Sequence, residues 1–153
     1  MEPREPYWSI ANTFAVSVLL GTLAIWSRAP IYVFGSEPQL YFYAHRRSAS
    51  RYIFVYPLML AFPDIRERQA GVVRELTERP PRFVVTVDNE CSFLSDPASP
   101  TLLRVELQRM LTDSYRIVGY VARREVQART PEGAPPPGQA KAEMVIWERT
   151  AGR

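Results

Sequence analysis

Arginine side chains gather in one short stretch of the chain and are the residues best suited to binding chemistry. His45 is followed by Arg46 and Arg47, and Arg51 lies four residues further on. A guanidinium presents a fork of N–H donors that binds phosphate oxygens in pairs, so the cluster predicts contact with phosphate in a lipid headgroup or a phosphorylated carrier. The same residues also fit a structural role, in which Arg46 and Arg47 are solvated and Arg51 pairs with an acidic residue. Glu37 is a suitable partner for that pair.

A second group of candidates follows the predicted strands. Gly35, Ser36 and Glu37 come directly after the first strand, and Asp88 comes after the third. Ligands of α/β sheets favour the carboxyl ends of strands, so these turns are expected to lie close together. Gly35 and Ser36 predict either a backbone nest for phosphate or an ordinary tight turn in which Ser36 is an N-cap. Carboxylates such as Glu37, Asp88 and Glu90 suit a divalent cation, but nothing in their spacing requires one, and a cap at Glu37 and a turn at Asp88 account for them, so no metal site is predicted.

Several catalytic and binding chemistries find no motif in the sequence. There is no G-x-S-x-G nucleophile elbow, and the sole histidine, His45, has no sequence partner for proton transfer. Cys91 is the single cysteine, which excludes a disulfide within the chain and a cysteine-rich zinc site. The charges from Arg66 to Glu78 alternate in sign and give no basic stripe for nucleic acid. We therefore predict no catalytic residue, no cofactor and no nucleic-acid partner.

Apolar patterning predicts an α/β domain. Strands are expected at 31–34, 52–56, 83–87, 115–121 and 143–148. Helix-start signals stand between them at Glu37, Asp64 and Pro100. This alternation favours a small Rossmann-like three-layer sandwich, with a mostly parallel sheet of about five strands and helices on both faces. Only a Pro/Gly-rich loop at 130–140 joins the last two strands, so the terminal strand is expected to be antiparallel.

Residues 1–29 differ in character from the α/β domain expected at 30–153. Residues 10–26 read IANTFAVSVLLGTLAIW, which has the length and composition of a membrane-spanning helix. Trp8 and Trp26 stand where interfacial aromatic residues are found. A buried or interfacial helix and a cleaved signal peptide are the alternatives, and the acidic leader MEPREP weakens the signal peptide. We therefore expect one apolar helix before the domain and a membrane localisation.

The stretch IYVFGSEPQLYFYAHRRSASRYIFVYPL, from Ile31 to Leu58, contains the spacings FG-x-EP-x-LY, A-x-RR-x-ASRY and YPL. In these spacings it resembles the soluble C-terminal region of bacterial membrane glycosyltransferases. These enzymes form the superfamily of the dolichyl-phosphate-mannose protein mannosyltransferases and the aminoarabinose lipid A transferases. The resemblance extends over roughly residues 31–121.

The resemblance implies an accessory domain or fragment of a glycosyltransferase that uses a polyisoprenyl-phosphate-linked sugar. The partners it implies are the transmembrane core of such an enzyme and a membrane lipid or polyisoprenyl-phosphate carrier. It also implies that the domain is extracytoplasmic. The acidic catalytic residue of the family belongs to an earlier loop that has no counterpart here, so no activity of this chain alone is implied. The alternative is a membrane-anchored α/β binding module without catalytic activity.

Overall fold

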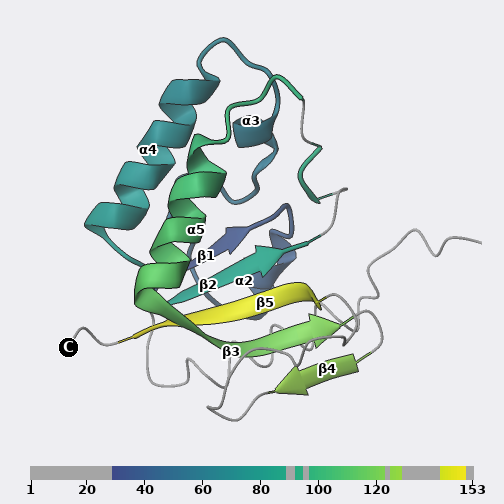
Figure 1. Cartoon of the computed structure of the whole chain (residues 1–153). Helices are drawn as coiled ribbons and strands as arrows, with labels where there is room; N and C mark the ends of the chain where they lie inside the picture. Colours follow the sequence, from purple (N-terminus) through teal and green to yellow (C-terminus); the bar gives the residue numbers. More distant parts are fainter. Residues whose placement is uncertain (1–28, 89–91, 95–96, 123–124, 129–141, 151–153) are drawn as a thin grey trace, which may run out of the picture.

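The computed structural model describes residues 29–88, 92–94, 97–122, 125–128 and 142–150, which form a mixed α/β fold (Figure 1). The strands of this part of the chain are β1 (Ile31–Phe34), β2 (Phe83–Val87), β3 (Tyr115–Ala122), β4 (Glu125–Ala128) and β5 (Ala142–Arg149). The helices are α2 (Gln39–Tyr43), α3 (Tyr56–Met59), α4 (Ile65–Glu78) and α5 (Leu102–Ser114). All of the strands belong to one sheet.

The sheet has the order β1-β2-β5-β3-β4, so the last strand of the chain lies inside the sheet. β1 and β2 are parallel, whereas β5 is antiparallel to both β2 and β3, and β4 is antiparallel to β3. The predicted antiparallel pairing of the last two expected strands is confirmed, but the prediction of a mostly parallel sheet is wrong. β1, β2 and β3 do share one direction, as strand and helix alternation predicts. The inserted β5 separates β2 from β3 and replaces a parallel pairing with two antiparallel ones.

The sequence of β5 explains its central position. Met144 and Ile146 are fully buried, and the intervening Val145 is half-buried, as is Trp147. A strand covered on both faces carries a continuous apolar run, whereas an edge strand with one solvated face alternates. The run MVIW therefore suits a strand with a neighbour on each side and side chains packed on each face.

The predicted strand at 52–56 is wrong. These residues form an irregular segment that leads into α3, and Pro57 lies in the first turn of that helix. Val55 is buried, but Ile53 and Phe54 are 49% and 38% exposed, so the run does not pack between two covered faces. Proline lacks the N–H that a continuing strand would need and fits the first turn of a helix.

Other residues cover the outer edge of β1. The backbone N–H of Ile31 donates to the carbonyl of Arg47 at 3.0 Å, and that of Ala49 donates to the carbonyl of Ile31 at 2.8 Å. The N–H of Val33 donates to the hydroxyl of Tyr41 at 3.0 Å. An unpaired strand edge is a template for aggregation, so these bonds protect the end of the sheet.

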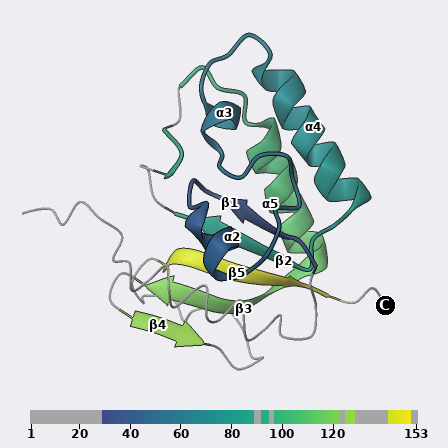
Figure 2. The ribbon, with the colours of Figure 1, turned by 180° about the vertical axis from the view of Figure 1, so that it is seen from behind.

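An apolar core lies on each face of the sheet. Tyr32 and Phe34 of β1 pack with the side chains of α3, α4 and α5 on one face (Figure 1). Ile31 and Val33 point to the other face, where Leu40 of the short α2 joins the core (Figure 2). Successive side chains of a strand point to opposite faces, so β1 contributes to both cores. Helices therefore lie on both faces, as predicted, although a single short helix serves the second face among the described residues.

A buried amide connects the helices of the first face. Gln69 of α4 has no exposed surface, and its Nε2 donates to the carbonyls of Leu58 and Pro100, both at 2.8 Å. Its Oε1 accepts the N–H of Leu103, in the first turn of α5, at 3.1 Å. One side chain thus satisfies backbone groups next to two other helices, including a donor that the start of α5 would leave unpaired.

Within the described residues, no helix has the length and apolar character needed to cross a bilayer. The apolar helix predicted at 10–26 and the loop predicted at 130–140 lie outside the described residues. The membrane segment therefore stays a prediction.

Candidate anion-binding site

Glu37 lies directly after β1, with only 4% of its surface exposed. The hydroxyl of Ser92, in the loop that follows β2, donates a hydrogen bond to Oε1 of Glu37. Oε2 of Glu37 and Oγ of Ser36 have no hydrogen-bond partner within the described chain. Burial raises the pKa of Glu37, and the hydrogen bond from Ser92 offsets only part of that effect. The neutral carboxyl is thus favoured more strongly here than in water.

The remaining residues of the predicted carboxyl-edge site have separate roles. A Cβ on Gly35 would overlap Oε2 of Glu37 and the side chain of Val87, so the close approach requires glycine. Ser36 is not the N-cap of α2, because that position is held by Pro38. Asp88 is exposed, and no cluster of three metal-ligating side chains occurs in the described residues. Gly35 and Glu37 therefore hold the turn after β1 against Val87 and Ser92, and the predicted ligand role of this edge stays a prediction.

The predicted arginine cluster lies at the other end of β1. The backbone of Arg47 pairs with Ile31, the first residue of the strand, which is roughly 10 Å from Phe34 at the carboxyl end, at about 3.3 Å per residue. The two groups of predicted site residues therefore do not meet. They are separated because residues 44–51 return the chain to the start of β1.

Arg51 has the structural role that the sequence allowed, but the predicted partner is wrong. Its Nε lies 2.6 Å from Oε1 of Glu75, on α4, and its backbone N–H donates to Oε2 of the same carboxylate at 3.2 Å. Partial burial alone would raise the pKa of Glu75, but the hydrogen bonds from Arg51 outweigh burial and lower it. Arg46 donates to the carbonyl of His45 at 3.2 Å, and Arg47 is exposed.

Three further arginines converge at this amino edge of the sheet. Nη2 of Arg82 and Nη2 of Arg116 contact the two carboxylate oxygens of Glu148 at 3.2 and 2.9 Å. Nη1 of Arg149 donates to the carbonyl of Pro80 at 3.4 Å. We call Arg82, Arg116, Arg149 and Glu148 the arginine edge. Its three guanidiniums and one carboxylate leave two positive charges.

The strand register produces this convergence. Glu148 of β5 lies opposite Phe83 of β2 on one side and Arg116 of β3 on the other. The N–H of Arg149 also donates to the carbonyl of Arg82 at 2.8 Å. The first residues of two strands and the last residues of a third, antiparallel strand are thereby brought side by side.

The electrostatics of the arginine edge favour an anion. Partial burial would raise the pKa of Glu148, but hydrogen bonds from Arg116 and Arg82 outweigh it and lower the pKa. The side chains of Arg82 and Arg116 are 45% and 60% exposed, against 16% for Glu148. The carboxylate is thus covered while much of each guanidinium faces solvent.

An open hollow of about 720 Å³ lies over the arginine edge, lined also by Ala29, Pro80 and Thr150. Each guanidinium has five N–H donors. Arg82 and Arg116 each use one of these donors in a hydrogen bond to Glu148. Planar donors of this kind bind phosphate oxygens in pairs. The arrangement is therefore suited to a phosphate-type anion.

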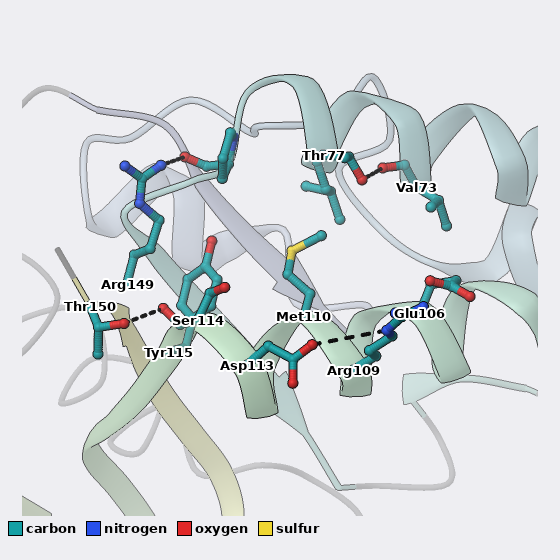
Figure 3. Close-up of a pocket in the computed structure, with 12 residues that line it drawn as sticks. Val73, Thr77, Glu106, Arg109, Met110, Asp113, Ser114, Tyr115, Arg149 and Thr150 are labelled. Carbon is teal, nitrogen blue, oxygen red and sulfur yellow. Dashed lines mark hydrogen bonds and ion pairs between the residues drawn. The ribbon is translucent and has the colours of Figure 1, made fainter. Parts of the chain in front are cut away.

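A groove of about 520 Å³ adjoins the hollow and runs between the C-terminal halves of α4 and α5 (Figure 3). Val73 and Thr77 of α4 face Met110 of α5 across it, and Arg149 lies at one end (Figure 3). Burial raises the pKa of Tyr115, in its wall, to about 12, although the charge of Arg149 opposes the shift. The groove thus combines apolar walls with a cationic end.

Sequence reasoning missed the arginine edge. Arg82, Arg116 and Arg149 are more than thirty residues apart in sequence and show no common motif. The signal that could have found them is positional, because each lies within two residues of the end of a predicted strand. That signal becomes useful only once the strand order is known.

Comparison with known proteins finds no matching family model, no similar curated protein and no similar solved structure. The resemblance of residues 31–121 to membrane glycosyltransferases therefore stays a prediction.

Proposed function

We propose that this chain is an α/β binding module whose arginine edge holds a phosphate-type anion. The observation that carries the proposal is the convergence of Arg82, Arg116 and Arg149 around one carboxylate, beneath an open hollow. The carboxylate of Glu148 neutralises one of the three arginine charges. The other two are left for a ligand, and a phosphate monoester or a diphosphate supplies a matching negative charge.

A second candidate function is that of an accessory domain in a glycosyltransferase that uses a polyisoprenyl-phosphate carrier. The position of Ala29 favours it, because Ala29 lines the hollow and the apolar run 10–26 ends three residues before it. If that run spans a bilayer, the arginine edge lies near the membrane surface, where lipid and carrier phosphates are found. In this form of the proposal, the bound phosphate belongs to the carrier or to a lipid headgroup.

The melting temperature of the full chain, measured with and without sodium pyrophosphate at constant ionic strength, tests the proposal. A ligand that binds only the folded protein raises the melting temperature, so we expect a rise of several degrees at saturating pyrophosphate. Arg149→Gln should remove most of that rise. It is the preferred variant because it leaves both ion pairs of Glu148 intact.

Arg66→Gln is the matched control. Arg66 is an exposed arginine in the first turn of α4, roughly 18 Å along the helix from the hollow. The control should keep the full rise. If the arginines serve only the fold, Arg149→Gln lowers the melting temperature equally with and without pyrophosphate, and the proposal fails.

A further inference from the structure

The hollow over the arginine edge and the groove between α4 and α5 lie next to each other. Both are lined by Pro80, Arg149 and Thr150. Figure 3 shows Arg149 and Thr150 together at one end of the groove, with Met110 further along it. A ligand held by the guanidinium of Arg149 therefore lies at the end of the groove.

The groove beyond that point is apolar. Its floor consists of Leu76, Met110, Val73 and the ring of Tyr115, of which Leu76 is 1% exposed and Val73 and Met110 are partly buried. Its lining also includes charged side chains, those of Glu106, Arg109 and Asp113. Of these, Arg109 and Asp113 form a loose pair at 3.9 Å with most of each side chain in solvent.

We propose that the ligand is a single-chain anionic amphiphile, with a phosphate-type head at the arginine edge and its alkyl chain in the groove. The inference rests on the proposed function and adds the chemical class of the ligand. Charge complementarity selects an anionic head, because the three guanidiniums at this end share one carboxylate, Glu148, among the described residues and leave two positive charges in excess. The apolar floor selects a chain, because a free phosphate would leave it exposed to water.

Photo-crosslinking of the full chain in phosphatidylcholine nanodiscs tests this inference. The probe is dodecyl phosphate with a diazirine at the end of the chain remote from the phosphate. We expect label on the peptides that contain Val73 or Met110. Excess dodecyl phosphate should suppress the label at least fivefold, whereas dodecyltrimethylammonium, with the same chain and the opposite charge, should not.

Two variants locate the two halves of the ligand. Arg149→Gln should lower labelling at least threefold because it weakens binding of the phosphate-type head. Met110→Gln should lower labelling at least threefold because it weakens binding of the alkyl chain. Leu102→Gln is the control for the second variant, because Leu102 is an apolar residue of the same helix that is already 40% exposed. The competition experiment on the unaltered chain stands on its own if Met110→Gln does not fold.

Each outcome decides between the two proposals. If pyrophosphate raises the melting temperature but α4 and α5 are unlabelled, the anion site stands and the amphiphile is wrong. Equal suppression by the two amphiphiles of opposite charge also overturns the inference, because the groove then binds any alkyl chain. If inorganic phosphate suppresses labelling as well as dodecyl phosphate does, the chain contributes nothing and the ligand is a free anion. If neither pyrophosphate nor the probe binds, both proposals fail.

Discussion

Glu37 couples the stability of the fold to pH. Its pKa in the folded protein is raised by burial, so the folded chain binds this proton more tightly than the unfolded chain does. The stabilisation is complete below the ordinary pKa of glutamate and is lost as the pH rises through the raised value. Near neutral pH, the buried carboxyl therefore costs stability that a neutral amide would not.

The stability of Glu37→Gln, relative to that of the unaltered chain, should therefore increase as the pH rises. We expect the melting temperature of the variant, relative to that of the unaltered chain, to increase between pH 4 and pH 7. Glu67→Gln, at an exposed position on α4, makes the same chemical change and is the matched control. A difference between Glu37→Gln and the unaltered chain that stays constant over this pH range would contradict the assignment.

Gln69 is the second residue whose environment gives a clear expectation. Gln69→Ala removes three hydrogen bonds and leaves the carbonyls of Leu58 and Pro100 and the N–H of Leu103 without their partner. Unpaired buried groups of this kind make the expected loss about 2–4 kcal/mol in the free energy of unfolding. Chemical denaturation measures it.

Gln108→Ala serves as the control for Gln69→Ala. Gln108 is an exposed glutamine on α5 whose side-chain amide makes a single 3.5 Å contact with Thr112. It should change the free energy of unfolding by about 0.5 kcal/mol or less. Equal losses at the two positions would show that the buried network carries no special stability.

At the scale of the elements, α4 contains a residue that weakens it. Gly71 lies in the interior of the helix, and a Cβ added there would meet nothing within 4 Å. Glycine costs a helix interior about 0.5–1 kcal/mol relative to alanine. Gly71→Ala should therefore raise the free energy of unfolding by about that amount, as measured by chemical denaturation.

Gly35→Ala is the contrasting variant. A Cβ at Gly35 would overlap Glu37 and Val87, so this substitution should lower the free energy of unfolding. Opposite signs for the two glycines are the expected result. A loss at Gly71 would contradict the open space around it.

The elements whose apolar residues follow the spacing of one strand or one helix were predictable from sequence. The strand FVVTV has the predicted bounds, Phe83–Val87, and the helix expected after Pro100 is α5. The run at 52–56 failed because its apolar residues are not all covered and Pro57 begins a helix. Gln69 was foreseeable in part, because it falls on the buried face of α4 with Ile65.

At the scale of the whole molecule, strand order decided what could be foreseen. The shared direction of β1, β2 and β3 follows from local alternation, but the insertion of β5 between β2 and β3 depends on pairings between residues more than 55 positions apart. The arginine edge is a consequence of that insertion. The cluster at 46–51 was visible in sequence because its members are neighbours, whereas the residues of the edge become neighbours only in the folded sheet.

The central claim is that the arginine edge binds a phosphate-type anion. The most direct measurement is an NMR titration of the full chain with sodium pyrophosphate at constant ionic strength, following the Nε–Hε signals of the arginines. We expect saturable shifts at Arg82, Arg116 and Arg149, with little change at two control residues, Arg66 of α4 and Arg104, which is exposed in the first turn of α5. Small, unsaturated shifts spread evenly over all of these arginines would mean general charge attraction and would contradict the claim.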